Sequence, residues 1–156
     1  MHEQEKGAQA TITKRGPESI DAIQPLWEAL NRHHADVSSH FTEHFEANDF
    51  DKRRAYLLAK AERGPLRIFM AEADAALQGY CVCTLSEGHG AIESLYVLDS
   101  RRGSGLGSRL MEAALAWLDA HGAVTKSLDV VHGNDAALSF YARLGFQPAS
   151  VVLKMK

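Results

Sequence analysis

The sequence has little cysteine and little proline. Only two of its 156 residues are cysteines and four are prolines. Cys81 and Cys83 are separated by one residue in an apolar stretch, so on a strand their side chains would point the same way and would not easily form a disulfide. This cysteine usage favours a reducing compartment, and we expect a cytoplasmic protein.

Long apolar segments and a large excess of one charge are also missing. We find no run of the length that crosses a membrane and no secretory leader, so we expect neither a membrane anchor nor a signal peptide. A formal net charge of −3 gives no global reason to expect nucleic acid as a partner. The composition, 46% hydrophobic and 24% charged, is that of an ordinary globular protein of one-domain size.

The hydrophobic pattern predicts a single α/β domain over residues 10–156, preceded by a disordered polar tail over residues 1–9. Strands are expected at residues 10–15, 66–73, 78–87, 91–98, 127–131 and 149–155, and the last would close the sheet. The runs at 66–73 and 78–87 are joined by a short connection, which indicates an antiparallel hairpin.

Four helices are expected between these strands. The first starts near Pro17, continues to His34 on a three-four apolar spacing, and is slightly kinked at Pro25. The others are expected in the second half of residues 38–64, from Leu106 to Gly122, and over residues 134–145 with Asn134 as N-cap.

The run "RRGSGLGS" at residues 101–108 lies between an expected strand and an expected helix. Such a turn directs backbone N–H groups and the positive helix end at one point, where an anionic phosphate is stabilised. It lacks the Gly-Lys-Ser/Thr ending of a P-loop, and its G-x-G-x-G spacing differs from the dinucleotide-binding fingerprint. A tight strand-to-helix turn with surface arginines is the alternative interpretation.

Two motifs carry a resemblance to a known family. The hexapeptide of residues 102–107 resembles the Arg/Gln-x-x-Gly-x-Gly/Ala signature of the GCN5-related N-acetyltransferase (GNAT) family. "NDAALSFYARLGF" resembles that family's second hallmark, an Asn before a helix that carries Phe-Tyr and ends in Leu-Gly-Phe. The specific part covers residues 92–146. Asp99, Arg101 and Ser104 depart from the family's usual Pro, aromatic and Lys around the turn; Asp99 would weaken the anion site, and Arg101 adds a cation.

The resemblance implies a mixed, mostly antiparallel sheet flanked by helices on both faces, with acetyl-coenzyme A as co-substrate; no metal is expected. It assigns the coenzyme's pyrophosphate to the turn at Arg102, Gly103, Ser104, Gly105, Leu106, Gly107 and Ser108. It assigns the pantetheine arm to the strand at Leu95, Tyr96 and Val97, which is expected to splay from its neighbour, and to Asn134. Backbone N–H groups near Tyr96 or Val97 would stabilise the oxyanion.

The resemblance also implies two catalytic residues. Glu93 occupies the position of the general base proposed for polyamine-type members, acting directly or through water, and Tyr141 is the usual candidate general acid. A glutamate on an exposed face, or one paired with a basic neighbour, is the alternative for Glu93. Packing in the core is the alternative for Tyr141, and helix capping, which is compatible with coenzyme contact, is the simpler role of Asn134.

Family members build the acceptor site from the first two helices and their connection, here residues 31–49. This segment contains the histidines His33, His34, His40 and His44, which we interpret as solvated or pocket-lining rather than metal-binding, since no Cys or HExxH pattern accompanies them. The region is acidic through Asp36, Glu43, Glu46 and Asp49, and through Asp51 just beyond the segment, which suits either a cationic amine or an ordinary solvated face.

The expected reaction is therefore acetyl transfer to a primary amine of a small molecule: a polyamine, an amino sugar or an amino-acid derivative. A protein N-terminus or lysine is the alternative acceptor, and a non-catalytic coenzyme A-binding sensor is the alternative class. Nucleic acid and membrane are not expected partners, and homodimers are a family-level expectation.

Overall fold

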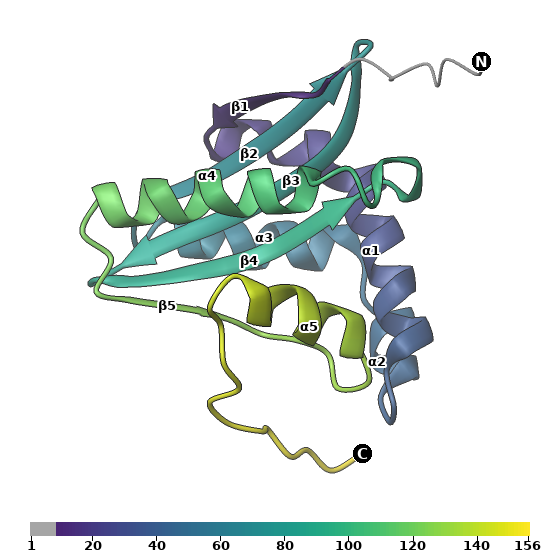
Figure 1. Ribbon diagram of the computed structural model, residues 1–156. Helices are drawn as coiled ribbons and strands as arrows, with labels where there is room; N and C mark the ends of the chain where they lie inside the picture. Colours follow the sequence, from purple (N-terminus) through teal and green to yellow (C-terminus); the bar gives the residue numbers. More distant parts are fainter. Residues whose placement is uncertain (1–8) are drawn as a thin grey trace, which may run out of the picture.

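A five-stranded sheet forms the centre of the computed structural model, which describes residues 9–156 (Figure 1). Its strands are β1 (Thr11–Arg15), β2 (Leu66–Ala73), β3 (Ala76–Ser86), β4 (His89–Val97) and β5 (Thr125–Leu128), in the order β1-β2-β3-β4-β5. All neighbours are antiparallel except β4 and β5, which are parallel. The predicted mixed, mostly antiparallel sheet is confirmed. Residues 1–8, which make up most of the expected tail, lie outside the described residues.

Helices cover both faces of this sheet (Figure 1). They are η1 (Pro17–Ile23, 3₁₀), α1 (Gln24–Val37), α2 (Thr42–Glu46), α3 (Phe50–Ala61), η2 (Asp99–Arg101, 3₁₀), α4 (Leu106–Ala120) and α5 (Asp135–Arg143). One core cluster packs α4 on the sheet, and a second packs η1, α1 and α3 on the opposite face. No helix in the described part of the chain is long and apolar enough to cross a membrane.

The alternation of β3 divides its side chains between the two clusters. Tyr80 and Val82 face the α1 and α3 side, whereas Cys81 and Cys83 face α4. Both cysteines are free and buried, and burial raises the pKa of the Cys83 thiol to about 12 and that of Cys81 well above its usual value. The prediction that the two cysteines are unpaired core residues of a strand is confirmed.

The single kinked helix predicted after Pro17 is wrong in detail. The segment forms a 3₁₀ helix that ends at Ile23 and an α-helix that begins at Gln24, with Pro25 in its first turn. Proline has no N–H to donate and is tolerated in the first helical turn, so a new helix starts there instead of bending.

The predicted final strand at residues 149–155 is also wrong. Residues 144–156 contain no helix or strand, and the side chains of Val151, Val152 and Leu153 are exposed. A continuous apolar run is typical of a strand that is covered on both faces, and no described residue covers this run, whose side chains are exposed. The outer edge of β5 therefore has no partner strand among the described residues.

Candidate active site

The turn between η2 and α4 adopts a conformation that favours glycine at two positions. Gly103 and Gly105 have φ angles of 78° and 81°, in the left-handed region that side chains disfavour. A Cβ added at either glycine would meet no atom within 4 Å. The backbone of this turn therefore borders open space, and a ligand can approach it closely.

The N-terminus of α4 continues this open surface. Gly105 occupies the N-cap position, and no side chain of the described residues caps the helix there. The first-turn N–H groups, which belong to Leu106, Gly107 and Ser108, have no acceptor within the helix itself. Uncapped N–H groups at the positive end of a 15-residue helix form an anion site.

The charged residues beside this turn contact one another across the surface. Arg102 Nη1 lies 3.1 Å from Asp99 Oδ1, and the Arg102 guanidinium lies over the Tyr96 ring at 5.5 Å. The side chains of this ion pair are 49% and 83% exposed, so the pair contributes little stability and an incoming phosphate can compete for the arginine. Arg101 donates from Nε to Gln78 Oε1 at 3.0 Å.

Strand β4 loses its β5 partner halfway along. The parallel pairing runs from His89 with Thr125 to Ile92 with Leu128 and ends there. The rest of β4, including Leu95, Tyr96 and Val97, pairs with β3 alone.

Glu93 lies at the start of this unpaired part, in a β-bulge. Val82 pairs with Ser94 and Cys83 pairs with Ile92, so Glu93 is an extra residue on β4. The bulge directs Glu93 and Ser94 to the same face, where the Ser94 hydroxyl lies 2.6 Å from the Tyr80 hydroxyl.

The Glu93 carboxylate is 6% exposed and is surrounded by donors. Lys60 Nζ forms an ion pair with Oε1, Thr84 Oγ1 donates to the same oxygen at 2.9 Å, and Tyr56 OH donates to Oε2 at 3.3 Å. The alternative that Glu93 pairs with a basic neighbour is therefore what the structure contains. For Glu93 to act as a base, its carboxylate must first separate from Lys60.

Tyr141 and Asn134 lie on and beside α5. Tyr141 is half-buried against the α4-side cluster, 5.1 Å from the Phe140 ring and 6.0 Å from the Phe146 ring. Burial raises the pKa of its phenol well above the usual value, so the hydroxyl stays protonated at neutral pH. Asn134 Oδ1 accepts a hydrogen bond from the Ala137 N–H at 3.3 Å, which confirms its predicted capping role.

The predicted residues therefore gather around the unpaired part of β4 but on different faces of the sheet. Glu93 contacts side chains of α3 and β3, whereas Tyr141 packs on the α4 side. Sequence reasoning missed the residues of α3 that reach the Glu93 carboxylate, namely Tyr56 and Lys60 on one helix face at i,i+4. The spacing of Tyr56 and Lys60 could have indicated that they share one helix face, but nothing in the sequence indicated that this face contacts β4.

The histidines of the acceptor segment make separate contacts. His34 packs edge-on against Phe45 at 5.6 Å, and its burial lowers its pKa to about 4. His40 stacks at 5.7 Å on His132, from the loop before α5. No group of three or more metal-ligating side chains occurs within residues 9–156.

The acidic residues of the same segment mostly face solvent. Asp36, Glu43, Glu46 and Asp51 are exposed, and Asp49 caps α3. Their arrangement is that of a solvated face rather than a pocket for a cation.

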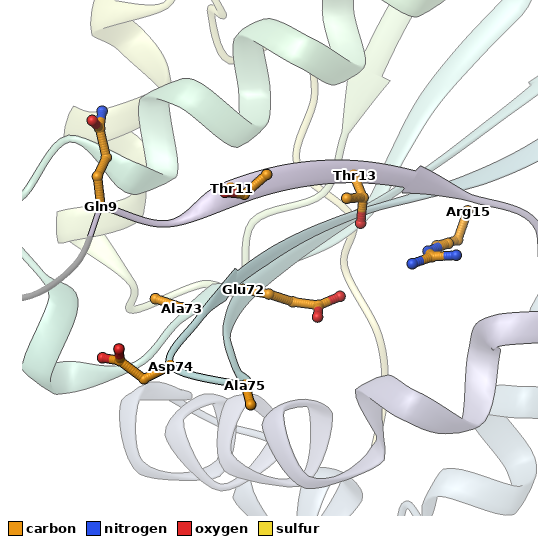
Figure 2. Close-up of a pocket in the computed structure, with 8 residues that line it drawn as sticks. All are labelled: Gln9, Thr11, Thr13, Arg15, Glu72, Ala73, Asp74 and Ala75. Carbon is orange, nitrogen blue, oxygen red and sulfur yellow. The ribbon is translucent and has the colours of Figure 1, made fainter.

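Two hollows occur away from the open part of β4. One of about 360 Å³ lies at the β1 edge of the sheet, where Thr11, Thr13 and Arg15 of β1 face Glu72 and the β2–β3 turn (Figure 2). Another, of about 400 Å³, lies between the residues of the α1–α2 connection and the C-terminal Lys156. Neither contains Glu93, Tyr141 or the glycine turn.

Comparison with known proteins identifies the family of this chain. Residues 27–146 match the model of the acetyltransferase (GNAT) family, and the chain belongs to this family. The aligned region includes the open part of β4, the glycine turn and α5.

Individual relatives are consistent with this assignment. A mycothiol acetyltransferase of Streptomyces avermitilis is 34% identical over 77% of this chain and 38% of its own length. An L-methionine sulfoximine/L-methionine sulfone acetyltransferase of Pseudomonas paraeruginosa is 32% identical over 64% of this chain and 60% of its own length. The chain thus spans less than two thirds of these curated relatives.

Among solved structures, the fold matches an aminoglycoside N-acetyltransferase in complex with coenzyme A. The TM-score is 0.68 at 18% sequence identity, and the match covers 97% of both chains. At this identity the likeness shows the shared fold alone.

Proposed function

We propose that this protein is an N-acetyltransferase that moves an acetyl group from acetyl-coenzyme A to a primary amine of a small molecule. The observation that carries the proposal is the end of the β4–β5 pairing at Ile92 and Leu128, in the same sheet edge that leads into the uncapped α4 N-terminus. An unpaired strand suits the amide groups of a pantetheine arm, and an uncapped helix end suits a pyrophosphate.

The residues around this opening fit the coenzyme as substrate. In the proposal, the phosphates lie on the turn of Arg102, Gly103, Ser104, Gly105, Leu106, Gly107 and Ser108. The pantetheine arm lies along Leu95, Tyr96 and Val97, near Asn134. The open space beside Gly103 and Gly105 supports the first assignment, and the missing β5 partner supports the second.

The proposed chemistry needs two proton transfers. The amine nitrogen attacks the acetyl carbonyl carbon, the carbon–sulfur bond breaks, and the new amide nitrogen loses a proton. Glu93 accepts a proton from the amine, directly or through water, once the amine has replaced Lys60 at the carboxylate. Tyr141, kept protonated by its raised pKa, donates to the departing thiolate.

Relatives support a small-molecule acceptor. The two curated relatives and the solved structure are named for mycothiol, methionine sulfoximine or sulfone, and aminoglycosides. A protein N-terminus or lysine remains the second candidate acceptor, and a coenzyme A-binding sensor without catalysis remains the alternative class. We also propose a protein without nucleic-acid or membrane partners, located in the cytoplasm.

The test follows free thiol while the protein is incubated with acetyl-coenzyme A and a panel of amines, amino acids, amino sugars and lysine peptides. We expect thiol release that depends on a small amine. Glu93→Gln should depress the rate most at low pH and be partly rescued as pH rises, because a larger fraction of the amine is then neutral. Glu112→Gln, at an exposed position of α4, is the matched control.

Two results would contradict the proposal. Coenzyme A binding without thiol release for any acceptor would identify a sensor module. A wild-type pH–rate profile in Glu93→Gln would show that Glu93 is not the base.

A further inference from the structure

Arg53 is a cation beside Glu93 that has no carboxylate partner in the described chain. Its Nη2 donates a hydrogen bond to the Glu93 backbone carbonyl, and its guanidinium lies over the Tyr56 ring at 4.9 Å. Its Nε atom is buried with no hydrogen-bond partner among the described residues. A half-buried guanidinium without a counterion is unfavourable, because its lost hydration is not replaced by an anion.

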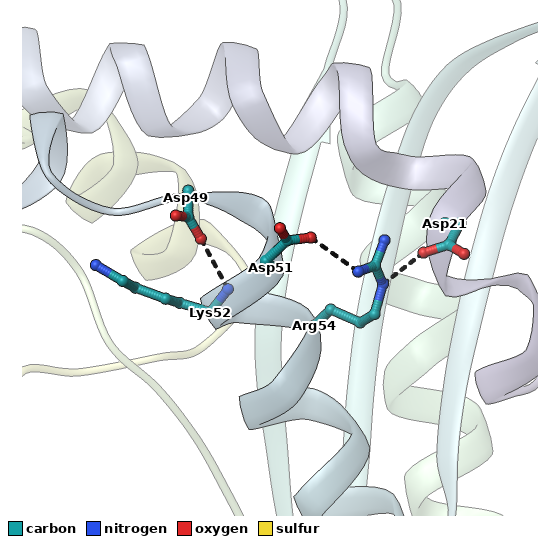
Figure 3. Close-up of polar contacts among 5 residues, drawn as sticks. All are labelled: Asp21, Asp49, Asp51, Lys52 and Arg54. Carbon is teal, nitrogen blue, oxygen red and sulfur yellow. Dashed lines mark hydrogen bonds and ion pairs between the residues drawn. The ribbon is translucent and has the colours of Figure 1, made fainter.

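The carboxylates on and next to α3 are engaged elsewhere (Figure 3). Arg54 donates to Asp21 at 2.7 Å and to Asp51 at 2.9 Å, so this neighbouring arginine holds two carboxylates. Asp49 accepts a hydrogen bond from the Lys52 N–H at 2.9 Å and thereby caps the helix. None of these three acids is paired with Arg53.

The remaining groups near Arg53 do not supply the missing negative charge. The Glu93 carboxylate is paired with Lys60. His34, whose pKa is lowered to about 4, is neutral at pH 7, and the charge of Arg53 contributes to that lowering. Among the described residues, two cations, Arg53 and Lys60, thus contact Glu93 and face its single carboxylate.

From this balance of charges we infer that the acceptor is an amine that also carries a carboxylate, as an amino acid does, and that Arg53 binds this carboxylate. The inference rests on the proposed acetyl transfer and narrows its acceptor class. A zwitterion complements the site, since its ammonium group suits Glu93 and its carboxylate suits the planar guanidinium. A polyamine or aminoglycoside would instead place further positive charge beside Arg53 and Lys60.

Arg53 is positioned to bind the carboxylate of the acceptor close to Glu93. Its bond to the Glu93 carbonyl fixes the guanidinium at the bulge, one residue beyond the last β4–β5 pair. The recognised carboxylate would therefore lie close to the carboxylate proposed to receive the amine proton, as the small separation of the two groups in an amino acid requires.

The test measures acetyl transfer to the twenty proteinogenic L-amino acids, to their amides, and to spermidine and kanamycin. We expect the highest kcat/KM for an amino acid, about 10-fold or more above its own amide. Arg53→Gln should lower kcat/KM for that acid about 10- to 100-fold and leave the amide nearly unchanged. Arg54→Gln, whose guanidinium is already paired, should keep the acid-to-amide ratio within about twofold of wild type.

Arg53→Lys provides a second variant if Arg53→Gln does not fold. Lysine keeps the positive charge but lacks the planar guanidinium that can donate two parallel hydrogen bonds to a carboxylate. The acid-to-amide ratio of kcat/KM should therefore be lower than in wild type but still favour the acid. A polycation or a neutral amine as the best substrate would overturn the inference, as would a ratio that Arg53→Gln leaves unchanged. If no acceptor is acetylated, the proposed function fails by itself. The inference is then decided by thermal stabilisation with N-acetyl amino acids against their amides, which should favour the acids in wild type and not in Arg53→Gln.

Discussion

Replacing Gly105 with alanine separates the structural from the ligand-binding role of the glycine turn. Gly105 has φ 81°, and its added Cβ would meet nothing within 4 Å, so the cost of alanine is conformational rather than steric. A left-handed conformation costs an alanine about 1 to 2 kcal/mol. For a chain of this size that corresponds to a decrease in Tm of about 2 to 8 °C.

Gly122, just beyond the other end of α4, provides a matched control. Its φ is 86°, and a Cβ there also meets nothing within 4 Å. Gly122→Ala should therefore lower Tm by a similar amount. Only Gly105→Ala places a methyl group in front of the uncapped helix end, and it should raise the Kd for coenzyme A about 10-fold or more.

The assays are calorimetric unfolding and titration with coenzyme A. Equal Kd values for the two variants, with Gly105→Ala folded, would show that the turn does not hold the pyrophosphate. A much larger loss of stability in Gly105→Ala than in Gly122→Ala would show that the turn is packed more tightly than its open surroundings indicate.

Three further predictions concern other buried groups. Tyr141→Phe should lower kcat about 10²-fold or more in thiol-release assays with little change in coenzyme affinity and no rescue at high pH, and normal turnover would leave Tyr141 a packing residue. Changing Cys81 and Cys83 to alanine should lower Tm and spare turnover, whereas a thiol-acetylated intermediate in mass spectra would assign them a catalytic role. His34 binds a proton in the unfolded chain near pH 6.5 but in the folded chain only near pH 4, so stability should fall as pH drops through that range, by on the order of 2 to 3 kcal/mol. His34→Gln should remove this dependence from urea unfolding curves, and an unchanged dependence would contradict the assignment.

The parts of the fold that depend on local sequence were predictable. Glycines at 103 and 105 mark a turn because only glycine adopts their φ angles at no cost, and Asn134 marks a helix start because its side chain caps that helix. The strands β2, β3 and β4 follow from alternating or continuous apolar runs bounded by turn residues.

The parts that depend on tertiary contacts were not predictable. Lys60 and Glu93 are 33 residues apart, and only the packing of α3 on the sheet brings them together. The same packing leaves Arg53 without a carboxylate partner among residues 9–156, which no pattern in the sequence indicates. The segment from Val151 to Leu153 has strand-forming residues, but the described part of the chain offers no cover for its apolar side chains, so propensity alone predicted a strand that does not form.

The bulge at Glu93 inserts one residue into β4 between two consecutive pairs with β3. Before the bulge, Ile92 faces α4; after it, Leu95 and Val97 face α4, because the extra residue reverses which positions of the strand point to each face. Without the extra residue the strand would alternate regularly from Ile92 through Ser94, so a deletion of Glu93 would leave Leu95 and Val97 toward α4 and Tyr96 toward α3. The bulge therefore adds one carboxylate to the α3 face, and the facing of the strand along which the coenzyme is proposed to lie does not depend on it.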